Sequence, residues 1–447
     1  MAMLESGLVG VLGKKPGKSH KNHTAGQGAY RFGDFDLYPA ERQLHRRQRP
    51  MKVSPKAFDA LLLFVRNAER LVRRDELIET LWPDTYVTDA NLTNVILTLR
   101  KTLGRRAIQT VSKFGYRFCL PVIGEPGVDQ VVYGTFVQGK DLATIRSLES
   151  MTRARDLFAL CVATDPQFAP GWAWLGRCYR FLDKFGAGPS MNLELAQAAL
   201  RRALAIDPQL ACAHHFYTQL QTDLGQPREA VVRLTQRIVV RGGEAESFAG
   251  LVQALRVCGL LDESLLAHQH AVRLDPTIVT SVAHTHFLRA EYEAALETYA
   301  NTGYYLDAAS WAALGDSKRA IALLSERLEK QPLSGQMGGS MRSLLAVLEG
   351  RRSEALGFIR NLPVEREPEL VFYLARHLAM LRSDDDCVAM LQQAREQGMT
   401  SSYTLLHDDV FGPLHSRSDF QREVEQAKVL EHGARQAFTH AKGRSAW

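Results

Sequence analysis

The spacing of hydrophobic positions changes several times within the first 120 residues. Short alternating stretches between residues 30 and 53 are separated by turn residues, as β-strands are. Apolar residues then recur at helical spacing in "SPKAFDALLLFVRNAERLV", in "RRDELIETLW" and over 89–103. Alternation returns over 107–120 and predicts a hairpin. Strands, three helices and a hairpin predict a small α+β domain over residues 30–122.

The predicted helices carry their own start and stop signals. Ser54 can cap the first helix, and Pro55 takes the favoured first helical position. Asp89 can cap the third helix, and Gly104 can end it. The positions expected to face the core are Phe58, Leu61, Leu62, Val65, Leu77, Ile78, Leu81, Leu92, Ile96, Leu99 and Leu103.

The third helix, residues 89–103, has a polar outer face beside the hairpin. A helix of this size fits a DNA major groove, where amides and hydroxyls can bond to base edges. The hairpin 107–120 can then act as a wing, and nearby cations can neutralise phosphates. A solvated amphipathic helix gives the same local pattern. The candidate contacts from this pattern are Asn91, Asn94, Thr98, Lys101, Arg105, Arg106, Lys113 and Arg117.

Four distributed stretches resemble the OmpR/PhoB-type winged-helix output domain. They are "LYPAERQLHRRQRPMKVSPKAFDALLLFV", "LVRRDELIETLWPD", "LRKTLG" and "IQTVSKFGYRF". The resemblance implies phosphate contacts at Trp82, Thr110 and Tyr116, and an internal ion pair at Arg100.

The same resemblance implies groove-facing positions at Ala90, Asn94, Leu97 and Thr98, where relatives often have arginine or histidine. Ser112 stands where many relatives have a wing arginine. Leu97 is then either an incidental exposed leucine or a contact to a thymine methyl or a partner subunit. The target sequence is therefore not transferable from a relative.

A different pattern begins near residue 136, where proline-bounded helices recur. "WAWLGRCY", residues 172–179, matches W-x₂-L-G-x₂-Y of the tetratricopeptide repeat. Gly225 and Gly259 are 34 residues apart, which is the period of that repeat. We expect an all-α tetratricopeptide-like solenoid of roughly seven hairpins over 136–425, with shortened units between 280 and 312. The expected fold class is therefore mainly α.

Such a solenoid offers a concave surface for a peptide or another protein. It can equally serve as a scaffold or dimerisation arm. The whole chain resembles the CadC/HilA-like regulators, without a membrane-spanning helix between the domains and without an N-terminal phospho-acceptor domain. That resemblance implies that control enters through the repeats.

The distribution of charge agrees with this division. Residues 1–120 hold 21 Lys+Arg and 11 Asp+Glu, or +10, and the remaining 34 and 38 give −4. A basic front part indicates a polyanionic partner for that part alone. We expect a disordered basic tail over 1–29, a linker over 123–135 and a C-terminal tail over 426–447.

The sequence shows no chemistry for catalysis. The six cysteines form no short-spaced pair, and histidines two apart on a helix point away from each other. We therefore expect no enzyme, no cofactor and no metal site. The tail "GKKPGKSHKNHTAGQG" imitates a phosphate loop, but its glycine spacing is one residue short.

These observations predict a bacterial-type transcriptional regulator that binds double-stranded DNA in the cytoplasm. No apolar run is long enough to span a membrane. The repeats would bind a protein partner, a ligand or a second copy of the chain. The main alternative is a protein–protein adaptor whose winged helix contacts protein. A nucleotide site in the N-terminal tail is a third, weaker reading.

Overall fold

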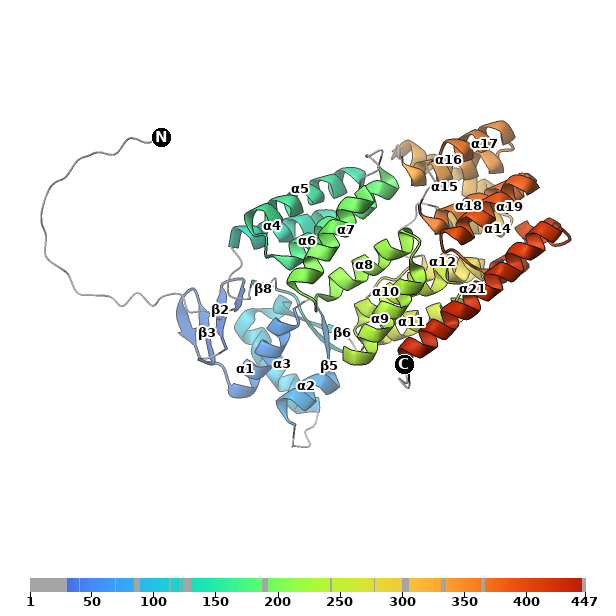
Figure 1. Cartoon of the computed structure of the whole chain (residues 1–447). Coiled ribbons are helices and arrows are strands. Elements are labelled where there is room, and N and C mark those ends of the chain that lie inside the picture. Colours follow the sequence, from blue (N-terminus) through green and yellow to red (C-terminus); the bar gives the residue numbers. More distant parts are fainter. Residues whose placement is uncertain are drawn as a thin grey trace, which may run out of the picture.

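The structure is a computed structural model of the chain. It describes residues 30–443, apart from 40, 69, 84–88, 112–113, 121, 124–129, 146, 187–191, 242, 277, 300–304, 331–334 and 363–365. A small α+β domain, residues 30–123, precedes a larger helical domain, residues 130–443 (Figure 1). The expected fold class is confirmed. The phosphate-loop imitation and the expected basic tail lie outside the described residues.

Two antiparallel sheets frame the small domain. The first has the order β4-β3-β2-β1-β8, and the second has the order β5-β7-β6. In the second sheet a Cβ on Gly115 would lie 2.2 Å from the Val72 carbonyl oxygen, so only glycine allows this close strand pairing. The strands are β1 (Tyr30–Phe32), β2 (Phe35–Tyr38), β3 (Gln43–Arg46), β4 (Arg49–Met51), β5 (Leu71–Arg73), β6 (Ile108–Val111), β7 (Gly115–Phe118) and β8 (Val122–Ile123).

Three helices pack between these sheets, α1 (Pro55–Arg66), α2 (Arg74–Leu81) and α3 (Asp89–Leu103). Ser54 caps α1 by accepting a hydrogen bond from the Ala57 amide, as predicted. Gly104 follows α3 with φ 103°, a backbone conformation that favours glycine. The core contains the expected apolar faces, but Leu62, Ile78 and Leu103 lie at its edge and are only partly buried.

The helical domain is a succession of antiparallel helices. Its elements are α4 (Gln130–Ile145), α5 (Leu148–Thr164), α6 (Ala169–Phe185), α7 (Asn192–Ile206), α8 (Ala211–Asp223), α9 (Pro227–Arg241), α10 (Ala245–Val257), α11 (Leu261–Leu274), α12 (Val282–Leu288), α13 (Tyr292–Thr298), α14 (Leu306–Ala313), α15 (Ser317–Lys330), α16 (Gln336–Leu348), α17 (Arg352–Asn361), α18 (Pro368–Met380), α19 (Asp384–Glu396), α20 (Ser402–His407), a short 3₁₀ turn (Asp409–Leu414) and α21 (Ser418–Lys442).

Small residues of the repeat pattern let neighbouring helices approach closely. A Cβ on Gly176 of α6 would lie 2.6 Å from Leu200 Cγ and 3.0 Å from the Ala196 carbonyl oxygen of α7. Gly225 ends its repeat turn with φ 76°. The described helices pair as nine hairpins, from α4/α5 to α20/α21, instead of the roughly seven expected. The surplus includes α12/α13, in the shortened stretch between 280 and 312, and α20/α21, which extends past the expected end at 425.

The second half of the solenoid turns back onto the first. α16 lies against α6 and α18 lies against α8, and Figure 1 shows α21 running back beside α9. The Glu367 amide donates to the Asp223 carbonyl oxygen at 3.1 Å, and Lys184 donates to the Glu367 carboxylate. Burial, followed by the charge of Asp223, raises the pKa of Glu367 to about 7. The inner face of the first repeats is thus partly covered by the chain itself.

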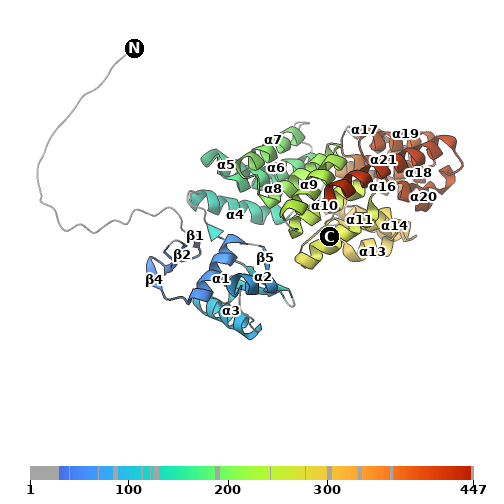
Figure 2. The ribbon, with the colours of Figure 1, turned by 60° about the horizontal axis from the view of Figure 1, so that its bottom comes forward.

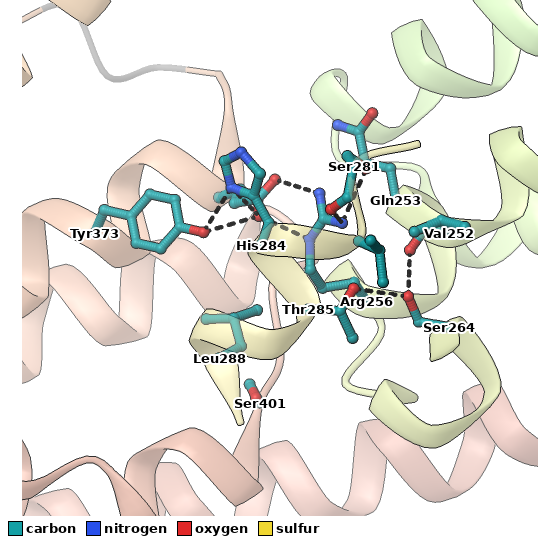
Figure 3. A network of polar contacts seen from close by, with 12 residues as sticks. Val252, Gln253, Arg256, Ser264, Ser281, His284, Thr285, Leu288, Tyr373 and Ser401 are labelled. Atoms are coloured by element: carbon teal, nitrogen blue, oxygen red, sulfur yellow. Dashed lines mark hydrogen bonds and ion pairs between the residues drawn. The ribbon is translucent and has the colours of Figure 1, made fainter. Parts of the chain in front are cut away.

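A buried polar network joins α10, α12 and α18 (Figure 3). The Arg256 guanidinium, 1% exposed, donates from Nε and Nη2 to the Glu369 carboxylate at 2.9 and 3.1 Å. Its Nη1 donates to the carbonyl and hydroxyl oxygens of Ser281. His284 Nδ1 lies 3.0 Å from the Tyr373 hydroxyl. These pairs satisfy charges that the fold removes from water.

Three expected boundaries are corrected. β8 ends the small domain at Ile123, because Val122 pairs with Phe32 of β1. Helix α4 begins at Gln130, within the expected linker. Helix α21 runs to Lys442, so residues 426–442 are not a tail. Its Ala434 and Phe438 are buried in a core cluster with residues of α9, α10 and α11, which explains why the helix continues.

Candidate nucleic-acid interface

Helix α3 lies on the side of the small domain away from the solenoid (Figure 2), and one of its faces is exposed and mostly polar. Leu92, Ile96 and Leu99 hold its opposite face in the core. Leu97 is 55% exposed in the middle of the polar face. The residues exposed on this face are Ala90, Asn91, Thr93, Asn94, Leu97, Thr98 and Lys101. The structure therefore brings together the α3 residues that the sequence predicts as base or phosphate contacts.

Two threonines of α3 bond to their own helix, Thr98 on this face and the partly exposed Thr102. Thr98 Oγ1 donates to the Asn94 carbonyl oxygen at 2.8 Å, and Thr102 Oγ1 donates to the Thr98 carbonyl oxygen at 3.0 Å. Such bonds fix the hydroxyl rotamer. The Thr98 oxygen is left with lone pairs that can accept a hydrogen bond from a base amine.

Arg100 fixes α3 against the hairpin. Its Nε and Nη2 donate to the Ile108 carbonyl oxygen at 3.0 and 2.8 Å, and Nη2 also donates to Thr110 Oγ1 at 2.7 Å. The resemblance implied an ion pair here, but the acceptors are a carbonyl and a hydroxyl. The arginine orients the helix relative to the strand that leads into the wing.

The remaining predicted contacts surround α3. Arg105 and Arg106 are exposed just after the helix, and Thr110 is exposed on β6. Trp82 follows α2 and is partly exposed. Tyr116 is only 5% exposed because its ring belongs to the domain core. Ser112 and Lys113 lie outside the described residues.

Arg117 has a partner in the other domain. Its Nη2 donates to both carboxylate oxygens of Asp275, at 2.8 and 2.7 Å. Asp275 follows α11 and caps its C-terminus through its backbone amide. Arg117 is thus separated from the exposed cations of α3 in the arrangement shown.

Two residues near the site were missed by sequence reasoning. Thr93 precedes Leu97 by one helical turn, so helical periodicity alone places it on the exposed face. Lys56 donates to the Leu81 carbonyl oxygen, and its Nζ lies 5.7 Å from the centre of the Trp82 ring. No local signal links Lys56 to Trp82, because they come from different helices.

Comparison with known proteins agrees with this geometry. Residues 48–118 match the family model described as "Transcriptional regulatory protein, C terminal". This part of the chain is a winged-helix domain of the OmpR/PhoB-type transcriptional regulators. In this chain the OmpR/PhoB-type domain is followed by a tetratricopeptide-like helical solenoid.

The similarity to curated regulators extends over about a fifth of this chain. The transcriptional activator CadC of Escherichia coli is 33% identical over 103 residues, which are 22% of this chain and 20% of CadC. The transcriptional regulator HilA of Salmonella typhi is 31% identical over 96 residues, which are 21% of this chain and 17% of HilA. The match thus spans about a fifth of these relatives.

A solved structure is also similar to part of this chain. The DNA-binding domain of E. coli CadC is 33% identical, and the alignment covers all of that chain and 23% of this one, with a TM-score of 0.21.

The buried histidine of the solenoid, His377, has structural partners. His377 Nδ1 lies 3.0 Å from Ser343 Oγ, and Tyr305 Oη bonds to Nε2. All three side chains are buried, and burial lowers the pKa of His377 to about 3, so the imidazole is neutral. Across the described ranges, no three His, Cys, Asp or Glu side chains gather as a metal site.

The cysteines of the chain are all free thiols. None of the six cysteines forms a disulfide. Burial raises the pKa of Cys178 and of Cys258 to about 12, which keeps these thiols protonated. None of the helices in the described part of the chain combines the length and apolarity that a membrane crossing requires.

Proposed function

We propose that this chain is a DNA-binding transcriptional regulator of bacterial type, acting in the cytoplasm. Helix α3 enters the major groove, and the hairpin β6–β7 lies beside it as a wing. The observation that supports this most is the exposed polar face of α3, held at a fixed angle to the hairpin by Arg100. Base recognition needs a helix that is held rigidly, with its apolar side packed in the domain core and its polar side free to enter the groove.

We divide the candidate contacts into two kinds. Base edges would be read by Ala90, Asn91, Asn94, Leu97 and Thr98. Phosphates would be held by Trp82, Lys101, Arg105, Thr110, Ser112, Lys113, Tyr116 and Arg117. Asparagine can form two bonds to adenine, and the apolar side chains can contact thymine methyls.

The test is selection of bound duplexes from a random DNA pool by the full-length protein, followed by a salt titration. We expect an enriched motif whose affinity falls steeply with salt, because phosphate contacts release counterions. Absence of enrichment by a folded protein at several salt concentrations, with and without the repeats, would contradict the proposal.

Substitutions on α3 test the division of contacts. Asn94→Ala and Thr98→Ala should change the preferred sequence, each at a cost of about 1–3 kcal/mol if it contacts a base. Lys101→Ala should weaken binding to all sequences and reduce the salt slope by about 1. Equal losses on selected and random DNA for all three variants would refute the division.

The repeats are proposed to bind a protein partner, a ligand or a second copy of the chain, and so to set DNA occupancy. A partner that prefers the DNA-competent arrangement raises occupancy by its differential affinity. Identical DNA binding by the full-length chain and residues 1–125, with and without candidate partners, would leave this role without support.

The alternative is a protein–protein adaptor in which the winged helix contacts protein. It is favoured by Leu97, a 55% exposed leucine at the centre of the α3 face, and by the lack of arginine among the groove-facing positions. A Leu97→Asp variant tests this alternative. If the chain is an adaptor, the variant loses the protein partner, and neither wild type nor the variant shows salt-dependent DNA binding.

A further inference from the structure

The outer face of the β5–β7–β6 sheet lies against the solenoid. Tyr116 and Phe118 of β7 point into the domain core, so Arg117 between them points outward. Leu71 lies directly opposite Arg117 in the sheet and shares that outer face. Figure 1 places β6 and the neighbouring strands beside α9 and α11.

Burial of this face is not explained by the small domain alone. Leu71 is 3% exposed, yet it is not among the residues that form the core of the small domain. The side chains of Arg117 and Asp275 are only 19% and 18% exposed. A sheet face that would be solvated in an isolated domain is therefore covered in the whole chain.

The domains are joined without a shared hydrophobic core. Within the described residues, every buried apolar cluster belongs to one domain or the other. Relative motion of two domains is the default expectation unless their interface is large and hydrophobic. A part-buried ion pair, here called the latch and formed by Arg117 and Asp275, then carries much of the specificity of docking.

We propose that the latch couples the solenoid to DNA binding by holding Arg117 away from the phosphate backbone. This inference rests on the proposed function and adds its regulation. Asp275 occupies the guanidinium and places a negative charge beside the wing, so docking weakens attraction to DNA. Any partner that draws the solenoid away from the wing releases one phosphate contact. DNA and Asp275 compete for the same cation.

The position of Asp275 favours such an exchange. A carboxylate at the C-terminus of α11 faces the negative end of the helix dipole, so it gains from a nearby cation. Asp275 caps α11 through its backbone amide and not through its side chain. Asp275→Asn therefore removes the charge while the helix end keeps its capping bond.

The test uses full-length protein and a random-sequence 30-base-pair duplex, since phosphate contacts do not depend on sequence. Binding is measured by fluorescence anisotropy over a series of KCl concentrations. We expect Asp275→Asn to bind about three- to tenfold tighter at low salt, with a salt slope steeper by about 0.9. Arg117→Gln should bind no tighter than wild type, because it removes the cation that opening of the latch would release.

The double variant tests whether the gain in DNA affinity depends on Arg117. In Arg117→Gln/Asp275→Asn the gain should disappear, since the released cation is absent. The matched control is Asp262→Asn, which removes the same charge from the opposite end of α11, about 20 Å away along the helix. A gain that survives without Arg117, or one that Asp262→Asn equals, would overturn the latch.

A second measurement needs no DNA. Small-angle scattering should give a larger radius of gyration for Asp275→Asn than for wild type and for Asp262→Asn. An unchanged radius would overturn the docking role of the pair. If wild type and all variants fail to bind the duplex, the proposed function fails; if wild type binds and Asp275→Asn does not differ, only the latch fails.

Discussion

At the scale of single residues, Arg100 links helix α3 to the hairpin β6–β7. We expect Arg100→Lys to lower the free energy of unfolding of the small domain by about 1–2 kcal/mol. A lysine ammonium cannot reproduce the two hydrogen bonds that Nε and Nη2 of Arg100 donate to the Ile108 carbonyl oxygen. DNA affinity should fall while the salt slope stays unchanged, since the charge is kept. Urea unfolding and anisotropy measure the two effects.

The control for this variant is Lys101→Arg, the next residue on the same helix. Lys101 is exposed, so the reverse exchange should leave stability unchanged within about 0.5 kcal/mol. If both exchanges have the same effect on stability, the hydrogen bonds of Arg100 are not what holds α3 to the hairpin.

In the solenoid, a substitution at Gly176 tests the close packing of α6 against α7. Gly176→Val should destabilise the helical domain by about 1–3 kcal/mol, because its Cβ would overlap Leu200. Gly357→Val is the matched control, since a Cβ at Gly357 of α17 meets nothing within 4 Å. Thermal unfolding compares the two, and equal midpoints would contradict the packing argument.

At the scale of elements, the pair between α10 and α18 predicts a pH dependence. Burial opposes ionisation of Glu369, but the charges of its neighbours, Arg256 first, and the hydrogen bond from Arg256 together outweigh it and lower the pKa from 4.5 to about 2. A carboxylate whose pKa is lowered by folding stabilises the fold at every pH above its pKa in the unfolded chain. This stabilisation is lost as the pH falls from about 4.5 to about 2. The contribution at pH 7 is on the order of 3 kcal/mol.

The stability difference between wild type and Glu369→Gln should therefore be largest near neutral pH and shrink toward pH 2. Urea midpoints measured across this range test it. Glu329→Gln, on the exposed side of α15, is the control and should run parallel to wild type. A Glu369→Gln difference that is constant with pH would contradict the ion pair.

Helix α21 gives a second prediction at this scale. A chain ending at residue 425 loses Ala434 and Phe438 from the core cluster with α9, α10 and α11. We expect it to lose about 3 kcal/mol or more of stability, as removal of a buried phenylalanine does. A chain ending at Gly443 should behave as wild type in thermal unfolding. If the two chains are equally stable, residues 426–442 do not contribute to the core, and the interpretation of this segment as a tail holds.

At the scale of the whole molecule, separate cores predict separate folding. Residues 30–123 should fold alone and unfold cooperatively, because their apolar cluster is closed within the domain. A fragment ending at residue 120 should be less stable, since it lacks β8, which pairs with Arg31 and Phe32 of β1. Circular dichroism on both fragments tests this, and an unfolded 30–123 would show that the solenoid is needed.

Much of this architecture is already visible in local sequence. Capping by Ser54, the extent of α3 and the glycine at each repeat turn are fixed by neighbours within one or two turns of chain. The polar face of α3 follows from helical periodicity alone. The expected boundary at residue 425 is wrong, because charged positions near the C-terminus of α21 obscure the two buried ones, Ala434 and Phe438.

The sequence by itself determined the elements, their order and the type of each domain, because periodicity, caps and turns act over a few residues. Tertiary structure alone decided how the solenoid turns back on itself and which residues it pairs. Arg117 and Asp275 are 158 residues apart, and Lys184 and Glu367 are 183 apart. Each is an ordinary surface charge in its local pattern, and only the packing of whole helices and sheets brings the partners together and removes them from water.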